Sequence, residues 1–387
     1  MLKKKTGGHA KSILILSATA GAGHVRAGDA LAETARTLSL PVQIQHEDIL
    51  SFTFPLFKKL YSETYYALVN ASPELWGYLY KKTEKNTVRK KPSFLKLFDH
   101  FNYKTYLKRL QEIRPDAIIC THFLPYAAIT DEIRKSTWRI PFFSVPTDYA
   151  VHALWIDPSI KRYYVATDEA AWTLSAQGIP NNNVVATGIP VMPQFRKALN
   201  KNVVRKKLGL RPNVFTIMVL SGGYGIGVID KLVPSIANFL STYGTNKQFQ
   251  LLVVCGKNPT LYDKLRGMDF PNTVHVQLYQ FISFVDALMN CSDVLITKSG
   301  GLTVSEALAE HLPMVIFDPI PGQEGRNADY VIEHGAGLSA INLPALHYKL
   351  QHLIDEPKQL DTMRKNAKQI ARPDAAKKIL EDVLQLV

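Results

Sequence analysis

Short runs of apolar, often β-branched residues alternate along the chain with longer stretches whose apolar residues recur every three or four positions. The short runs are typical of buried strands, and the longer spacing is typical of amphipathic helices such as 24–38, with Ala27, Leu31, Ala35 and Leu38 on one face. The predicted strands are 13–16, 43–46, 117–120, 142–145, 163–166, 215–220, 251–254, 274–277, 294–296 and 314–317. Strands that alternate with helices predict an α/β fold with parallel sheets covered on both faces.

Two such series follow one another, and each opens with a strand and a glycine-rich turn. This repetition predicts two doubly wound domains, which suits a chain of 387 residues because a single core rarely grows that large. The joint is predicted in 188–193, Gly-Ile-Pro-Val-Met-Pro, where three structure-breaking residues stand within six positions. The predicted domains are 1–192 and 193–372, followed by a C-terminal helix within 373–387.

The charge balance indicates an anionic partner. Lys and Arg number 46 against 33 Asp and Glu, a formal net charge of +13, although the 20% of charged residues is ordinary. Such a surplus fits nucleic acid, an acidic membrane surface or a phosphorylated ligand. No RNA-binding signature accompanies the basic residues, which cluster beside aromatic ones, so nucleic acid is not expected.

The stretch between the second predicted strand and Asp116 exceeds what a minimal βαβ unit needs. Its aromatic side chains are Phe52, Phe54, Phe57, Tyr61, Tyr65, Tyr66, Trp76, Tyr78 and Tyr80. Its basic side chains include Lys81, Lys82, Lys85, Arg89, Lys90, Lys91 and Lys96. Aromatic residues at headgroup level beside basic ones favour docking on anionic lipid. The alternative is a solvated basic face beside ordinary core aromatics.

Features of targeting and compartment are few. The apolar run 12–16 follows three lysines but is too short for a signal peptide, so a buried strand is predicted there. No run is long enough to span a bilayer, so any membrane contact is expected to be peripheral. Cys120, Cys255 and Cys291 are odd in number and show no metal-ligand spacing, which favours a reducing cytosol and predicts no metal site.

The first glycine-rich turn is Gly-Ala-Gly-His at 21–24. It precedes a helix whose N-terminal N–H groups could face an anion or oxyanion. A dinucleotide fingerprint is the weaker alternative, because Arg26 stands at its third glycine position, although Asp48 could be its ribose acid. At the first helical turn the macrodipole would keep His24 neutral and able to accept a proton, unless the ring merely caps or packs.

The second glycine-rich turn is Ser-Gly-Gly-Tyr-Gly-Ile-Gly at 221–227. It lacks the Gly-Lys-Ser/Thr ending of a P-loop, so Mg²⁺-dependent phosphoryl transfer is not expected. Its four glycines exceed what a plain turn needs, which favours close approach of the backbone to a ligand.

The densest motif is Ile-Thr-Lys-Ser-Gly-Gly-Leu-Thr-Val-Ser-Glu at 296–306. A diphosphate could lie on the N–H groups of the helix that follows, while Glu306 accepts ribose hydroxyls. Thr303 and Glu306 also match a capping box, but the box does not explain the two glycines, which favour a ligand. Next comes Pro-Ile-Pro-Gly-Gln-Glu-Gly-Arg-Asn at 319–327, where Gln323 and Glu324 suit sugar hydroxyls or simply form an acidic first turn.

Together these motifs resemble the donor signature of the monogalactosyldiacylglycerol synthases and the bacterial processive diacylglycerol glucosyltransferases. The likeness rests on 296–301 and 320–327 and continues through 21–24, Pro-Thr-Asp at 146–148, 164–168, 188–190 and Val-Cys-Gly-Lys-Asn at 254–258. It implies an inverting GT-B enzyme of glycosyltransferase family 28, with two Rossmann-like domains facing across a cleft and the C-terminal helix crossing back to the first. Ser299 stands where the glucosyl enzymes usually carry Pro, and 221–227 looks closer to the galactosyl enzymes, so the sugar stays open between glucose and galactose.

The resemblance also implies roles by position. His24 would be the base or would orient the acceptor hydroxyl, with Gly23 and Asp148 beside the acceptor. Uracil would be held near Phe281 and Ile282, ribose by Glu306, and the sugar by Gln323 and Glu324, with Asn327 as a further donor-binding residue. The diphosphate would lie at Ser221, Gly222, Gly223, Ser299, Gly300, Gly301 and Thr303. The aromatic and basic composition of the stretch before Asp116, rather than the resemblance, adds Trp76, Lys81, Lys82, Arg89, Lys90 and Lys91 as candidates for acceptor or membrane contact.

The reaction implied is transfer of glucose or galactose from a UDP-sugar to diacylglycerol or a glycosyl-diacylglycerol, without cofactor or metal, on the cytoplasmic face of the membrane. Three alternatives remain: an N-acetylglucosaminyl transferase acting on a polyprenyl-linked acceptor, a UDP-sugar epimerase of the same fold, and a non-catalytic UDP-sugar sensor.

Overall fold

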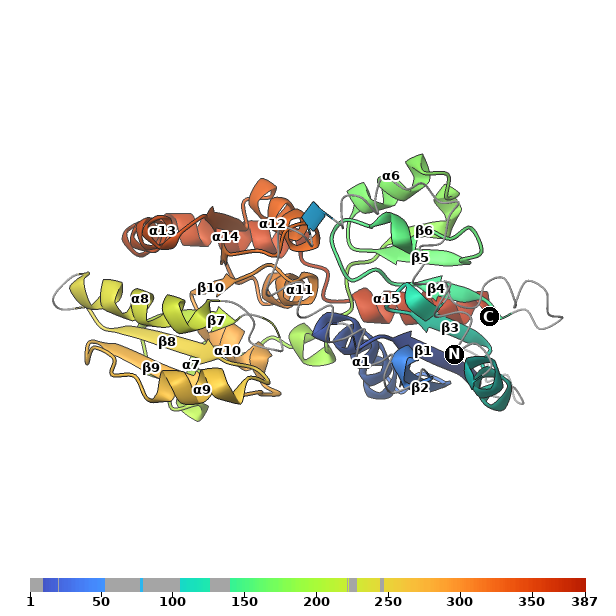
Figure 1. Cartoon of the computed structure of the whole chain (residues 1–387), viewed down its shortest axis with the longest axis horizontal. Coiled ribbons are helices and arrows are strands. Elements are labelled where there is room, and N and C mark those ends of the chain that lie inside the picture. Colours follow the sequence, from blue (N-terminus) through green and yellow to red (C-terminus); the bar gives the residue numbers. More distant parts are fainter. Residues whose placement is uncertain are drawn as a thin grey trace, which may run out of the picture.

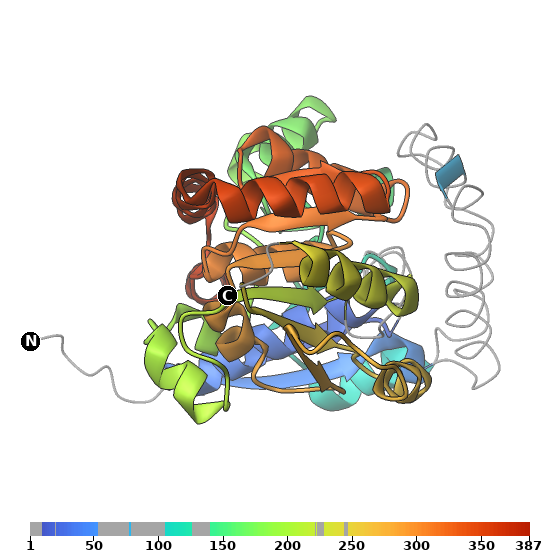
Figure 2. The same cartoon turned by 90° about the vertical axis from the view of Figure 1, so that its left-hand side faces the viewer.

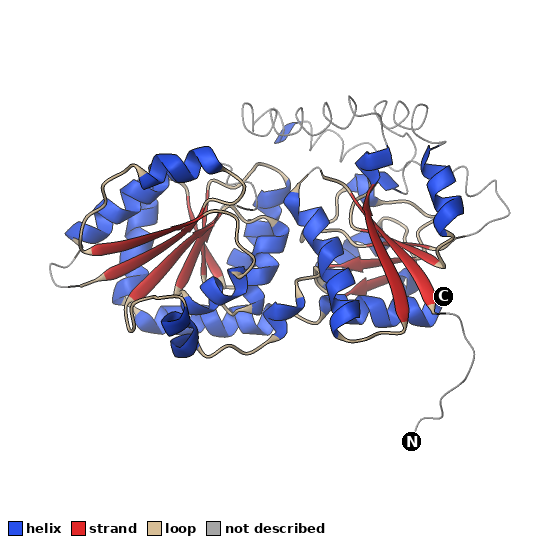
Figure 3. Ribbon diagram, turned by 90° about the horizontal axis from the view of Figure 1, so that it is seen from below, coloured by secondary structure: helices blue, strands red, loops and turns tan. Residues whose placement is uncertain are grey.

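The computed structural model describes residues 10–19, 21–52, 77–78, 105–125, 140–220, 222, 228–243 and 247–387. Two α/β domains lie side by side, the first in blue and green and the second in yellow to red (Figure 1). Seen from the end, the second domain stands in front of the first (Figure 2). The strands of both sheets lie between layers of helices (Figure 3).

The N-terminal domain contains a six-stranded parallel sheet in the order β2-β1-β3-β4-β5-β6. Its strands are β1 Lys11–Ser17, β2 Val42–Asp48, β3 Ala117–Cys120, β4 Phe142–Ser144, β5 Arg162–Val165 and β6 Val184–Ala186. Among the described residues, the helices with defined bounds are α1 Ala22–Thr37 and α6 Asp168–Ala176, with short 3-10 helices η1 Ile49–Phe52, η2 Ala153–Trp155 and η3 Asn181–Asn183. The five strands predicted here are confirmed, and the short edge strand β6 was missed.

The C-terminal domain contains a second six-stranded parallel sheet, in the order β12-β11-β10-β7-β8-β9. Its strands are β7 Phe215–Leu220, β8 Phe249–Val254, β9 Val274–Tyr279, β10 Val294–Thr297, β11 Met314–Phe317 and β12 Gly337–Ala340. Its helical segments are η4 Pro193–Arg196, α7 Lys201–Lys207, α8 Ile229–Thr242, α9 Pro259–Arg266, α10 Val285–Cys291, α11 Gly301–Ala309, α12 Gln323–Glu333, α13 Leu343–Asp355 and α14 Pro357–Ile370. Strand β12 was missed, since Gly and Ser interrupt its apolar pattern.

Successive residues of β1 face opposite cores, which explains why its sequence is continuously apolar. Leu14 and Leu16 belong to one buried cluster, and Ile13 and Ile15 belong to another. The second cluster also holds Ile379, Leu380 and Val383 of the C-terminal helix α15, Ala375–Leu386. The last helix of the chain therefore packs on the sheet of the first domain, and Figure 1 shows it in red beside α1.

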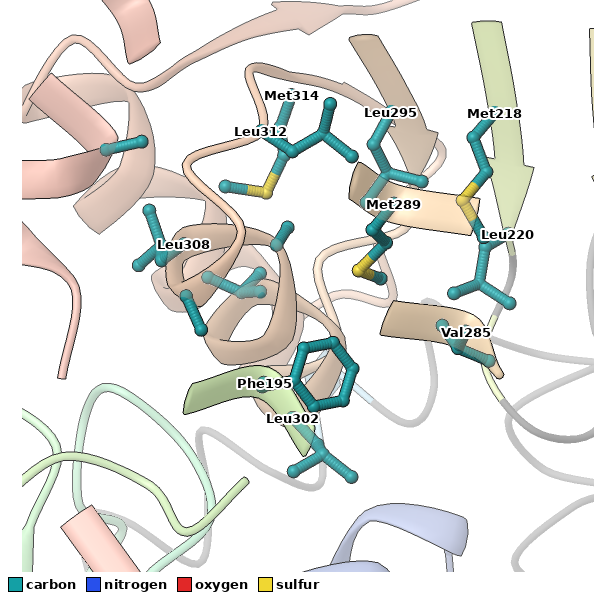
Figure 4. Packing of buried hydrophobic residues seen from close by; sticks show 14 of the residues in the cluster. Phe195, Met218, Leu220, Val285, Met289, Leu295, Leu302, Leu308, Leu312 and Met314 are labelled. Carbon is teal, nitrogen blue, oxygen red and sulfur yellow. The ribbon is translucent and has the colours of Figure 1, made fainter. Parts of the chain in front are cut away.

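A third buried cluster joins the domains. It surrounds α11, where Figure 4 shows Leu302 beside Phe195. Tyr149 of the first domain belongs to the same cluster. Apolar packing is thus continuous from the second domain into the first.

Each sheet reverses its order of strands at one point, β1 between β2 and β3 and β7 between β8 and β10. In open parallel sheets, ligands bind outside the carboxyl ends of the strands at such a switch point. In this chain the two switch points open onto one shared cleft.

Candidate active site

The cleft encloses a cavity of about 390 Å³ between the domains. Its N-terminal wall contains the turn 21–26 and the loop residues Thr147 and Asp148. Its C-terminal wall contains residues that follow β7, β8 and β10, together with the segments 281–285 and 320–324. Of the residues predicted from the sequence, those that line the cleft are Gly23, His24, Asp148, Gly222, Phe281, Ile282, Gly300, Gly301, Thr303, Glu306, Gln323 and Glu324.

His24 lies in the first turn of α1, where its ring is held from one side. Its Nδ1 lies 2.9 Å from the carbonyl oxygen of Thr121 and 2.8 Å from Oγ1 of Thr147. Because a carbonyl oxygen only accepts, Nδ1 carries the hydrogen and Nε2 keeps its lone pair. The N-cap of α1 is Gly21, so His24 is not the capping residue.

The surroundings of His24 favour the neutral ring. Burial lowers its pKa, an effect that the charge of Asp148 partly opposes. The ring of His122 meets it edge-on at 4.7 Å, and burial holds the pKa of His122 well below its usual value. His122 was not singled out from the sequence, although it stands just after the carboxyl end of β3, beside the switch point.

Helix α11 starts without a capping box. Its N-cap is Gly300, which makes no side-chain cap bond, so Thr303 lies inside the helix. Gly301 has a structural reason to be glycine that the sequence did not indicate. A Cβ at Gly301 would overlap the carbonyl oxygen of Thr147, so the glycine admits the backbone of the other domain.

Glu306 is only 4% exposed and meets Arg26 across the cleft. Nη2 of Arg26 donates to Oε1 of Glu306 at 3.0 Å. Burial raises the pKa of Glu306, and the nearby guanidinium opposes that shift. In the sequence, Arg26 was noted only because it occupies the third glycine position of a dinucleotide fingerprint. In the structure it joins the two domains at Glu306, the carboxylate expected to bind ribose.

Gln323 and Glu324 begin α12, after Gly322 with φ 100°. Oε2 of Glu324 accepts from the backbone N–H of Ile320 at 2.7 Å. Burial raises the pKa of Glu324 to about 8, against the opposing charge of Lys298. A carboxyl group beside an amide offers both donors and acceptors, which is what a sugar hydroxyl needs.

Another part of the C-terminal wall contains an aromatic side chain and basic side chains. Phe281 is 52% exposed, and Nζ of Lys257 lies 5.1 Å from the centre of its ring. Lys257 and Lys298 both line the cleft, although neither was assigned a role from the sequence. An exposed ring with one ammonium group over it, in a cleft that a second lysine also lines, suits a base and a diphosphate.

Ser299 and Asn327 were expected to contact the donor, but their side chains face the interior. Ser299 is fully buried with φ 74°, and its hydroxyl donates to the carbonyl oxygen of Glu324 at 2.8 Å. Asn327 is also fully buried and bonds to Asp148, Tyr149 and Ser299. Both polar side chains are satisfied by protein groups, so we assign them to holding the walls together.

The remaining predicted residues lie outside the described residues: Ser221, Gly223, Trp76, Lys81, Lys82, Arg89, Lys90 and Lys91. Within the described ranges, no group of three or more His, Cys, Asp or Glu side chains is placed to hold a metal ion. In the same part of the chain, no helix combines the length and the apolar character needed to cross a bilayer.

Two family models match successive parts of the chain. Residues 24–191 match monogalactosyldiacylglycerol (MGDG) synthase, and residues 216–379 match the glycosyltransferase family 28 C-terminal domain. Processive diacylglycerol beta-glucosyltransferases of Bacillus cereus (strain AH187) and Bacillus anthracis (strain A0248) are each 29% identical over 372 residues, which is 96% of this chain and 93% of each relative.

Solved structures share the fold. MurG of Acinetobacter baumannii superposes with a TM-score of 0.64 at 16% identity, covering 97% of this chain and 100% of its own. A UDP-GlcNAc 2-epimerase from Neisseria meningitidis, bound to UDP-GlcNAc, gives 0.59 at 15% identity, covering 97% and 100%. The calicheamicin glycosyltransferase CalG4 gives 0.59 at 13%, covering 98% and 100%. Transferases and epimerases both occur here, so these likenesses establish the GT-B fold and no more.

The predicted family is confirmed by the matches along both halves of the chain. The same matches exclude the alternative interpretation of residues 21–24 as a dinucleotide-binding turn. The chain is a hexosyltransferase that belongs to the monogalactosyldiacylglycerol synthase and processive diacylglycerol glucosyltransferase family, within glycosyltransferase family 28.

Proposed function

We propose that this chain transfers glucose or galactose from a UDP-sugar to diacylglycerol or a glycosyl-diacylglycerol, with inversion at the anomeric carbon. The single observation that carries the proposal is the cleft itself. It brings His24, whose Nδ1 is held by Thr121 and Thr147, into one cavity with Glu306, Glu324 and the N-terminal residues of α11. The names of the sequence relatives supply the classes of sugar and lipid.

The proposed chemistry is a single displacement. The acceptor hydroxyl oxygen bonds to the anomeric carbon while the bond from that carbon to the β-phosphate oxygen breaks, and UDP leaves with the electron pair. Nε2 of His24 takes the hydroxyl proton. We assign the negative charge of the departing diphosphate to the N–H groups at the start of α11 and to Lys298, without a metal ion.

The donor is proposed to lie along the C-terminal wall. Uracil would lie against the segment of Phe281 and Ile282, ribose at Glu306, and the hexose at Gln323 and Glu324. The relatives' names include both a glucosyl and a galactosyl enzyme, so the sugar itself requires measurement.

The test is mass spectrometry of lipids after incubation of the protein with diacylglycerol and either UDP-glucose or UDP-galactose. A glycosyl-diacylglycerol product that is missing with the His24→Ala variant supports the proposal. Transfer only from UDP-N-acetylglucosamine to a polyprenyl-linked acceptor, release of free sugar, or binding of donor without turnover would each replace it with one of the alternatives.

We further propose that the protein docks peripherally on the cytoplasmic face of an anionic membrane. The support is the net charge of +13 and the aromatic and basic composition of 52–96. Each basic residue near such a surface adds roughly 1 kcal/mol of attraction. Replacing Lys81, Lys82, Arg89, Lys90 and Lys91 with Gln should abolish sedimentation with anionic vesicles and spare activity on detergent-dispersed acceptor. A variant that still pellets at low salt excludes this stretch as the docking surface.

A further inference from the structure

We propose that Asn327 is a positioning residue that fixes Asp148 beside His24, and so connects the sugar-binding helix α12 to the base of the opposite domain. The inference rests on the proposed function, in which His24 takes the acceptor proton. It differs from the role that the sequence implied, a direct contact with the donor.

The hydrogen bonds of Asn327 leave nothing for a sugar. Its Nδ2 donates to Oδ1 of Asp148 at 3.0 Å and to the carbonyl oxygen of Ser299 at 3.1 Å. Its Oδ1 accepts from the backbone N–H of Tyr149 at 2.8 Å. Both amide hydrogens are used, and the side chain has no exposed surface through which the remaining lone pair could meet a ligand.

The position of Asn327 joins three parts of the cleft. On α12 it follows Gln323 by four residues and Glu324 by three, so all three lie on one face of the helix. The hydroxyl of Ser299 donates in turn to the carbonyl oxygen of Glu324. Asp148 stands 179 residues away in the chain, on the loop after β4. The side-chain amide of Asn327 thereby fixes helix α12, the turn before α11 and the loop of Asp148 relative to one another.

What Asp148 contributes is a charge close to the base. Its carboxylate raises the pKa of His24 against the larger effect of burial, and it can stabilise the imidazolium that forms when His24 takes a proton. The other titratable or charged groups that face this pair are His122 beside His24, and His152, Arg326 and Glu324 around Asp148. Burial raises the pKa of Asp148 itself, and the amide of Asn327 is the strongest opposing contact.

The test uses two isosteric changes, Asn327→Leu and Asp148→Asn, and their combination. Each single variant should reduce kcat by about tenfold or more, the scale of a lost hydrogen bond to a charged group. Each should keep the Kd for UDP-sugar within about twofold by calorimetry, a bound that one hydrogen bond to the donor would exceed. Each should move the acid limb of the kcat profile to lower pH, and the double variant should go little further than Asp148→Asn.

The matched control is Asn366→Leu, since Asn366 makes one amide bond to the carbonyl oxygen of Gly335, away from the cleft. It should keep the wild-type kcat and pH profile. If Asn327→Leu does not fold, Asn327→Ala takes its place, and Asp148→Asn must still shift the profile.

Two results overturn the inference. Weaker binding of UDP-sugar but not of UDP, with an unmoved pH profile, makes Asn327 a sugar contact. If a lower Tm accounts for the whole fall in kcat, and the pH profile is again unchanged, Asn327 is an ordinary packing residue. Failure of the wild-type chain to form any glycolipid sinks the proposed function instead, so the two failures are distinguishable.

Discussion

The imidazole of His24 derives its chemistry from the groups that surround it. Thr121 and Thr147 bind Nδ1, burial disfavours the charged ring, and Nε2 is left to accept a proton. The sequence predicted the residue and its neutral state from its place at a helix N-terminus. The tautomer depends on a carbonyl 97 residues away, which no local pattern reveals.

His24→Ala should reduce turnover by roughly a hundredfold or more, the scale of a lost general base. The affinity for UDP-sugar should barely change, because the proposed donor contacts lie on the other domain, and calorimetry checks this. Since the proposed base acts as the neutral ring and burial lowers its pKa, wild-type activity should persist to lower pH than an ordinary histidine base allows, and should be lost as the pH falls further. Near-normal turnover of the variant contradicts the role of His24, and so does loss of donor binding with an intact fold.

Glu306→Gln and Glu324→Gln should weaken the binding of different parts of the donor. Loss of the Glu306 carboxylate should weaken binding of UDP itself, whereas loss of the Glu324 carboxylate should weaken UDP-sugar and spare UDP. A hydrogen bond to a charged group contributes about 1.5–3 kcal/mol, so changes of tenfold or more in Kd are expected. The two variants are controls for each other, and equal loss of UDP binding in both would remove the division between ribose and sugar contacts.

Helix α11 illustrates how an element is fitted to its neighbour in space. Two glycines at its start are consistent with a phosphate site, yet the backbone of Thr147 leaves no room for a Cβ at Gly301. The strand β10 and the helix itself were predictable from apolar runs and spacing. The reason for Gly301 was not, because its neighbour lies on a loop of the other domain.

Gly301→Ala should therefore press the domains apart. Overpacking of this kind costs about 1–3 kcal/mol, so Tm should fall together with kcat. Thermal unfolding and steady-state kinetics check both. Gly267→Ala is the matched control, because a Cβ there meets only ordinary contacts, the nearest at 3.6 Å. Equal effects of the two changes would show that the approach of Thr147 is not what requires the glycine.

On the scale of the whole molecule, the domains are joined at several levels. Arg26 meets Glu306, the hydroxyl of Tyr149 lies 2.9 Å from Oγ of Ser305, and α15 returns from the second domain to the sheet of the first. The residues proposed to hold donor and acceptor are thus fixed relative to one another by contacts between the two halves of the chain.

Leu380→Ala should destabilise the N-terminal domain although the residue comes from the end of the chain. Its side chain is fully buried against the cluster of Ile13 and Ile15, and such truncations cost about 2–5 kcal/mol. Urea denaturation should show the loss. Leu384→Ala, which removes a partly buried side chain from the same helix, should cost less. Comparable losses at both positions would argue against tight docking of α15 on this sheet.

Local patterns determined much of this protein by themselves. Apolar runs predicted ten of the twelve strands in the described part of the chain, because a strand buried on both faces must be apolar throughout. Contiguous motifs identified the turns that line the cleft and the family. The tertiary structure alone decided which polar groups meet: Arg26 with Glu306 across 280 residues, and Asn327 with Asp148 across 179. Such contacts depend on how the two folded domains pack against each other, and this packing produces no periodic pattern of residues in the sequence.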